Sequence, residues 1–120
     1  MSLTAHHLES NGIPTVVVGS AKDIVEHCGV PRFLFVDFPL GNPMGAPYNR
    51  KMQLEISRLA VQLLEQATEH GTIKRAPFEW PGDPNWRAIY NRVNESNAAS
   101  LKALGERRRD YRRALPKRDI

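Results

Sequence analysis

The stretch RFLFVDFPLGNPMGAPY, from Arg32 to Tyr48, decides the fold. It opens with an apolar run, Phe33–Val36, that is short, aromatic and β-branched, so it predicts a strand buried on both faces. In the segment that follows, every second residue from Pro39 to Pro47 is proline or glycine, which excludes regular structure. Open α/β sheets form ligand crevices where a strand ends in such a loop. The stretch therefore predicts a central strand followed by a site-like loop.

The residues before this stretch predict a βαβ unit. Thr15–Gly19 reads TVVVG and predicts a second buried strand. Between the strands we expect a short helix that begins at a Ser20 capping box, ends at Gly29 and packs one apolar face on the sheet, formed by Ala21, Ile24, Val25 and Cys28. Right-handed crossover geometry makes the two strands parallel. Since two parallel strands do not form a stable sheet, we expect the missing neighbour to come from another chain or from upstream sequence.

Further helices are predicted on either side of this unit. Leu3–Asn11 predicts the last turns of a helix that stops before Gly12. A long helix is expected from Tyr48 or Asn49 to His70, with a main apolar face (Met52, Ile56, Leu59, Ala60, Leu63, Leu64 and Ala67) and a second apolar side at Leu54 and Val61. An apolar surface this wide suits a helix that packs both on a sheet and on a partner.

The last third of the chain is expected to be less regular. Thr72–Pro81 predicts a linker anchored by Phe78 and Trp80, and Asp83-Pro84 predicts the start of a long, increasingly polar helix that ends at Pro116. The fold class is thus α/β: a partial three-layer βαβ unit with parallel strands, followed by a long C-terminal helix. We expect residues 1–76 to form the α/β domain and residues 77–120 a helical extension with a basic tail.

Composition describes one ordinary globular domain. The chain has 120 residues, of which 41% are hydrophobic and 25% charged. No apolar run approaches the roughly 20 residues that span a bilayer, and no secretory signal opens the chain, so no membrane association is expected. The single cysteine cannot form an internal disulfide, which favours a cytoplasmic location. The net charge of +4 comes from the tail, because residues 101–120 contain eight basic and three acidic side chains while the rest of the chain has a net charge of −1.

Most side chains with chemical potential have a structural interpretation. Cys28 lies on the predicted apolar stripe, where a free cysteine serves as a small core residue. His6 and His7 are adjacent on a helix, about 100° apart around its axis, which does not suit joint binding of a metal. His27 and His70 lie near helix C-termini, where the dipole favours imidazolium. With no phosphate-binding glycine motif, zinc spacing or Ser/His/Asp set present, we expect no metal or cofactor.

Asp37 and the loop after it form the candidate site. A carboxylate near the end of an apolar strand needs hydrogen-bond partners, so Asp37 either caps the following amides or contributes to a site. The loop offers backbone amides at two glycines, on which an anion or an amino-acid carboxylate would rest, and a rigid structural connection is the alternative. The candidate ligand-binding residues are Arg32, Asp37, Gly41, Asn42 and Gly45.

Three segments carry a family resemblance. GIPTV (Gly12–Val16), PRFLFVDFPLGNPMGAPY (Pro31–Tyr48) and PFEWPGDPNW (Pro77–Trp86) resemble the selenoprotein B family of glycine, sarcosine, betaine and D-proline reductases. The specific part is the run FVDFPLG-x-P-x-G-x-P. The resemblance covers roughly residues 3–97 and implies a Rossmann-like α/β fold. It also implies reductive C–N cleavage by a selenocysteine or cysteine motif that precedes the helix leading into GIPTV.

The chain departs from this family at the redox motif. No selenocysteine or cysteine precedes Cys28, and Cys28 does not match the family's redox position, so we expect no catalytic residue here. One interpretation is a selenocysteine codon read as a stop, with the gene called from the next methionine. The other is a natural short form completed by a partner. We expect a reductase-like domain that is inactive alone and acts as a homo-oligomer or with a partner reductase subunit.

The basic tail points to a different class of function. RRRDYRR (Arg107–Arg113) places five arginines around one tyrosine, an electrostatic footprint for phosphates. Against this, Glu106 and Asp110 lie within helical reach of the arginines and offset part of their charge. A solvated helix end is therefore favoured over nucleic-acid binding, and an acidic protein surface is the further alternative.

Overall fold

The computed structural model describes residues 1–90 and 92–115. The chain forms two compact units, Met1–Arg87 and Ala88–Ile120. The elements, in chain order, are α1 (Ser2–Ser10), β1 (Val17–Gly19), α2 (Lys22–Cys28), β2 (Arg32–Phe35), α3 (Arg50–Gln66), β3 (Thr72–Arg75), α4 (Trp86–Ile89) and α5 (Ala98–Ala114).

The three strands form one parallel sheet in the order β1-β2-β3. The predicted parallel pairing of the first two strands is confirmed, with Val17 opposite Phe33. The expected two-stranded sheet is wrong, because residues predicted to be a linker form β3, in which Ile73 lies opposite Phe33. TIKR offers a single apolar side chain, so its strand is specified by backbone pairing and not by an apolar pattern. The chain itself therefore supplies the neighbour that β2 needs.

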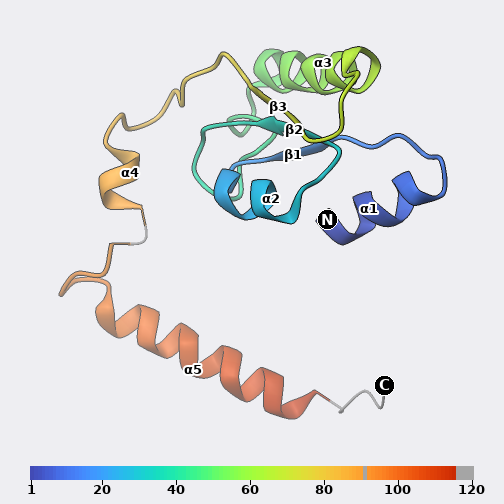
Figure 1. Ribbon diagram of the computed structural model, residues 1–120. Helices are drawn as coiled ribbons and strands as arrows, with labels where there is room; N and C mark the ends of the chain where they lie inside the picture. Colours follow the sequence, from blue (N-terminus) through green and yellow to red (C-terminus); the bar gives the residue numbers. More distant parts are fainter. Residues whose placement is uncertain (91, 116–120) are drawn as a thin grey trace. The chain divides into compact units, whose positions relative to one another are not determined.

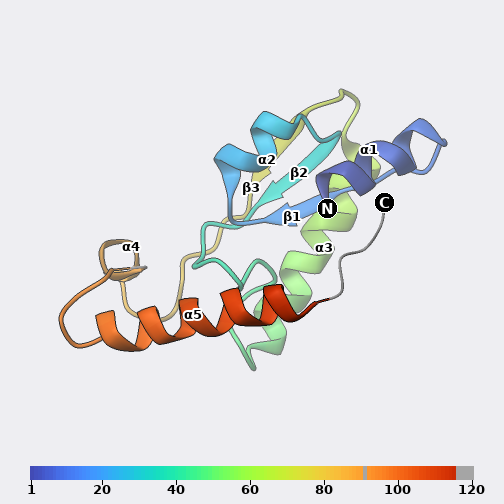
Figure 2. The same ribbon diagram turned by 90° about the horizontal axis from the view of Figure 1, so that it is seen from below.

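Helices cover both faces of the sheet, as Figures 1 and 2 show: α3 on one face, α1 and α2 on the other. Phe33 and Leu34 of β2 are fully buried on opposite faces, which confirms a central strand covered on both sides. The core toward α3 consists of Leu34, Val36, Phe38, Ile56, Ala60, Leu63 and Ala76. The core toward α1 and α2 consists of Ala5, Val17, Val30 and Phe33. The three-layer α/β fold class is thus confirmed.

The second helix departs from expectation. It begins at Lys22 without a side-chain cap, and the Ser20 hydroxyl has no hydrogen-bond partner, so the predicted capping box is wrong. Gly29 ends it in the left-handed conformation, as predicted. The predicted apolar stripe is also wrong: no residue of α2 is buried, Cys28 is exposed, and Val25 is its contribution to the core. A helix of seven residues is too short to lay a full stripe on the sheet.

The third helix agrees with its apolar pattern. The Asn49 side chain accepts a hydrogen bond from the Met52 N–H and caps the N-terminus. Ile56, Ala60 and Leu63 are buried against the sheet. Leu54 and Val61, on the predicted second side, are 49% and 53% exposed. The helix therefore presents apolar side chains to solvent as well as to the core.

The predicted single C-terminal helix is instead two helices, α4 and α5. Between them the side chains of Asn94 and Asn97 accept hydrogen bonds from each other's backbone N–H groups. Such local side-chain bonds compete with helix continuation. The long helix α5 is confirmed, none of its residues is buried, and the predicted end at Pro116 lies outside the described residues. Within residues 1–90 and 92–115, no helix is long and apolar enough to cross a membrane.

Candidate functional site

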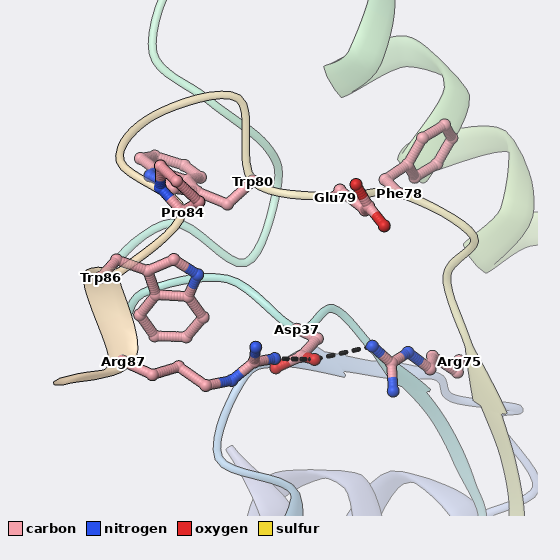
Figure 3. A pocket seen from close by; sticks show the side chains of 8 residues that line it. All are labelled: Asp37, Arg75, Phe78, Glu79, Trp80, Pro84, Trp86 and Arg87. Carbon is pink, nitrogen blue, oxygen red and sulfur yellow. Dashed lines mark hydrogen bonds and ion pairs between the residues drawn. The ribbon is translucent and has the colours of Figure 1, made fainter.

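The carboxyl ends of β2 and β3 bring Asp37 and Arg75 together. Parallel strands end at the same edge of a sheet, and Asp37 follows β2 while Arg75 is the last residue of β3. The Asp37 carboxylate accepts a hydrogen bond from the Arg75 guanidinium at 2.7 Å and a second from the Arg87 guanidinium (Figure 3). The Asp37 side chain is 15% exposed, whereas both arginine side chains are more than half exposed. One largely buried carboxylate thus binds two guanidinium groups at the surface.

A cavity of about 180 Å³ lies beside this cluster, within the first unit. Its wall contains three aromatic rings and four charged side chains, and Figure 3 shows Arg75 and Arg87 reaching the Asp37 carboxylate from its two sides. Typical pockets for drug-sized ligands are about 300–1,000 Å³, so this cavity suits a smaller molecule. The lining residues are Asp37, Arg75, Phe78, Glu79, Trp80, Pro84, Trp86 and Arg87.

Aromatic rings position the charged groups. The Arg87 guanidinium lies 4.9 Å from the centre of the Trp86 ring, and the Arg75 guanidinium lies 5.8 Å from the centre of the Phe35 ring. Trp80 packs edge-on against the buried Phe38, with ring centres 5.3 Å apart. Each arginine is therefore held by an aromatic face as well as by Asp37.

This arrangement favours a small anionic or zwitterionic ligand. A guanidinium presents a planar fork of donors that matches a carboxylate, and two such groups face one carboxylate here. Asp37, Glu79 and the tryptophan faces would accept a ligand's ammonium group. The eight lining residues include no cysteine, serine or histidine, so the wall supplies binding groups without a nucleophile of those types.

Arg32 lies at the opposite end of β2 from Asp37. Its guanidinium donates to the Glu9 carboxylate at 2.6 Å, which joins the end of α1 to the start of β2. The same carboxylate accepts a 2.6 Å hydrogen bond from the Thr15 backbone N–H. That backbone bond, with smaller contributions from the Thr15 hydroxyl and from Arg32, lowers the pKa of Glu9 although partial burial opposes the shift. Arg32 therefore anchors a helix, away from the cavity.

The predicted loop residues Gly41, Asn42 and Gly45 do not line the cavity either. The Gly45 N–H donates to the Asn42 carbonyl, so the expectation of a free amide at Gly45 is wrong. Gly45 has φ +108° and lies so close to Met52 that an added Cβ would stand 3.3 Å from its Cγ. These contacts make the loop a tight connection into α3, and ligand binding by these three residues stays a prediction.

Arg75, Trp86 and Arg87 were missed as site residues. The sequence does not point to Arg75 because it predicts a linker where β3 lies, and a linker residue has no defined edge on which to meet Asp37. The two residues from α4 lie about fifty positions after Asp37, a distance that local patterns do not bridge. A usable signal was the tryptophan-rich segment Pro77–Trp86, which carries part of the family resemblance.

The remaining chemical candidates lie apart from this cavity. The His6 ring Nε2 bonds the Cys28 carbonyl oxygen at 2.8 Å and links α1 to α2. Among the residues that the structure describes, no group of three or more His, Cys, Asp or Glu side chains is arranged to hold a metal.

Comparison with known proteins gives one distant relative. The chain is 30% identical over 73 residues to D-proline reductase subunit gamma of Acetoanaerobium sticklandii. The match covers 61% of this chain, which spans about 30% of the length of that relative. No protein-family model matches the chain, and no solved structure matches it. The chain is thus distantly related to a subunit of a reductase.

Proposed function

We propose that the first unit is a reductase-type α/β domain of the selenoprotein B kind, which binds a small amino-acid-like molecule in the Asp37 cavity. The distant relationship to a D-proline reductase subunit supports the reductase part of this proposal. The observation that supports an amino-acid-like ligand is the Arg75–Asp37–Arg87 cluster beside an aromatic wall. The redox group for C–N cleavage would come from outside this chain, which is then inactive alone.

The geometry gives each group a task in binding. The ligand carboxylate engages the exposed guanidinium edges of Arg75 and Arg87, which Asp37 holds side by side. The ligand ammonium group lies against Asp37 or Glu79 and is screened from water by Trp80 and Trp86. Uncharged ligands of the same size would lose both ionic contacts.

Binding can be followed through the indole N–H signals of Trp80 and Trp86 in NMR spectra. Titration with D-proline, glycine, sarcosine and betaine is expected to shift both signals at millimolar concentration, whereas the uncharged analogue pyrrolidin-2-one leaves them in place. Arg87→Gln should weaken binding about tenfold or more, since a charged hydrogen bond is worth about 1.5–3 kcal/mol. Arg58→Gln makes the same change on α3, outside the cavity, and should bind as the wild type does. If none of these amino acids moves the indole signals, the proposal fails.

Partners are part of the same proposal. The relative is named as a subunit, so its enzyme contains other chains, which supports a partner reductase subunit for this chain too. A turnover assay with D-proline and a dithiol reductant should detect no product from the purified chain. Proline reduction by this chain alone would contradict the assignment of the redox group to another polypeptide.

A second candidate function rests on α5. Leu101, Leu104 and Tyr111 are all exposed and recur at the spacing of a helix–helix seam. Helix geometry places Arg107, Arg108 and Arg112 along this seam, while Glu106 and Asp110 fall on the other side. An apolar seam bordered by cations supports docking on an acidic protein surface, with nucleic acid as the alternative.

Salt titration separates these alternatives. Five to eight phosphate contacts would give a slope of log K against log salt of about −4 to −7. Micromolar binding of duplex or single-stranded oligonucleotides with that slope, lost on deletion of residues 106–120, would favour nucleic acid. Absence of oligonucleotide binding at low salt would retire that alternative.

A further inference from the structure

The outer face of α3 has the pattern of a helix–helix seam. Ile56, Ala60 and Leu63 face the sheet. At about 100° per residue, Leu54, Arg58 and Val61 fall on the opposite side of the helix. Leu54 and Val61 are about half exposed and Arg58 is exposed. Leu54 and Val61 lie seven residues apart and form a short apolar seam along this outer face, and the charged side chains of Lys51, Arg58 and Glu65 lie beside it.

Charges along this face are complementary to those of a second, antiparallel copy. Glu55 and Arg58 border the seam on the same flank, and in an antiparallel pair the same flanks of the two helices face each other. An axis between these two positions therefore sets Glu55 of each copy opposite Arg58 of the other. The ends match as well, because Arg50 and Lys51 of one copy approach Glu65 of the other. A parallel pair would instead set like charges opposite each other.

The shape of this face fits the same partner. A shallow, open hollow of about 320 Å³ lies on α3 between Ser57, Arg58, Val61 and Gln62. In the antiparallel arrangement Leu54 of the second copy arrives over this hollow, and the two-fold axis repeats the contact. Each copy thus offers both a leucine and a hollow to receive one.

We infer that α3 is the interface of a homodimer, in which two copies pair through antiparallel α3 helices with two Leu54 contacts and two Glu55–Arg58 ion pairs. The helix has 17 residues and is about 25 Å long, so the pair buries less than the roughly 800 Å² per partner of a standard interface. The dimer therefore forms and dissociates with concentration in the micromolar range or above. No residue of this seam lines the Asp37 cavity, so the dimer is independent of the proposed ligand.

Charge reversal tests this interface by sedimentation velocity over a concentration series. The wild type should pass from monomer to dimer. Arg58→Glu alone and Glu55→Arg alone should each raise the dissociation constant at least about tenfold, because each sets like charges opposite each other. A mixture of these two variants should associate again, since every cross-chain pair is then of opposite charge. Lys22→Glu makes the same charge change on α2, which covers the other face of the sheet, and should leave the dissociation constant within about twofold.

Three results would overturn the inference. The first is a wild type that remains monomeric up to near-millimolar concentration. The second is a dimer whose dissociation constant is the same in Arg58→Glu, or a mixture that does not reassociate. The third is a dimer that disappears when residues 98–120 are deleted, which would assign the contact to α5. Circular dichroism of each variant shows whether α3 is intact, because both exchanged side chains lie off its buried face.

Discussion

At the scale of single residues, the charged side chains at the two ends of β2 have separate tasks. Glu9 and Arg32 hold α1 at the amino end of the strand, and Asp37 draws Arg75 and Arg87 together at the carboxyl end. The first pair is an anchor that can be measured through stability. The second cluster is open to solvent on its arginine side and can be measured through a ligand.

Glu9→Gln should lower the free energy of unfolding by about 1–2 kcal/mol at neutral pH, because Arg32 and the Thr15 N–H lose a charged acceptor. The pKa of Glu9 is lower in the folded than in the unfolded chain. Its contribution is therefore complete above its usual pKa of 4.5 and is lost as the pH falls through the lowered value. Urea unfolding should show the gap between wild type and variant closing as the pH falls below 4.5. Glu26→Gln, on the exposed side of α2, is the control and should show no such gap.

Gly45→Ala and Gly41→Ala separate backbone strain from crowding. Both glycines have positive φ, so each substitution costs about 1 kcal/mol or more in strain. The added methyl group at Gly45 also meets Met52 and Ile56 at 3.3–3.4 Å, whereas the one at Gly41 meets nothing within 4 Å. Thermal unfolding should therefore show the larger loss of stability for Gly45→Ala. Equal losses would mean that α3 yields to the new methyl group.

The sequence predicts one of the four charged residues of the candidate site. Asp37 stood out because a carboxylate after a buried strand needs partners, and that requirement is local. Arg75 and Arg87 are surface arginines like many others in this chain until the fold brings them to Asp37. Arg32 lies at the other end of β2, where its guanidinium bonds Glu9, so ligand binding by Arg32 stays a prediction.

At the scale of elements, the two faces of α3 contribute very differently to the free energy of unfolding. Ile56→Ala should cost about 2–5 kcal/mol, because it empties a fully buried site between helix and sheet. Val61→Ala, on the outer face of the same helix, should change stability by less than about 0.5 kcal/mol in dilute solution. Denaturant unfolding of the two variants compares the faces directly. A comparable cost for both would mean that Val61 is covered in the monomer.

The buried run of β2 and the buried face of α3 were predicted well, whereas the apolar stripe of α2 and the elements set by backbone contacts were not. The run Phe33–Val36 and the sheet-facing side of α3 are rich in apolar side chains, so their burial can be predicted from the sequence. Strand β3 has exposed Lys74 and Arg75, and its place beside β2 depends on hydrogen bonds that no side-chain pattern records. The break before α5 depends on Asn94 and Asn97, whose side chains accept hydrogen bonds from each other's backbone N–H groups.

At the scale of the whole molecule, the domain boundary predicted from the sequence and the boundary of the compact first unit give different expectations for the stability of truncated chains. The sequence predicts a domain that ends at Ala76, whereas the compact first unit ends at Arg87. Phe78 and Trp80 pack on the core shared with α3, so a chain cut after Ala76 should lose several kcal/mol, on the order of two large apolar contacts. A chain cut after Arg87 keeps them and should unfold at nearly the urea concentration of the full chain. Equal midpoints for the two truncations would support the boundary at Ala76.

Strand β3 has a consequence for the behaviour of the protein at high concentration. An outermost strand offers its unpaired backbone to any other strand, which is the usual route to aggregates. Here that strand is four residues long and carries exposed Lys74 and Arg75. If two copies paired along it, these positive side chains would lose water and repel each other, which disfavours the pairing. Lys74→Val should therefore raise light scattering on storage, while Lys22→Val on α2 should not. The charges on β3 would keep the solution clear while two copies meet through their helices.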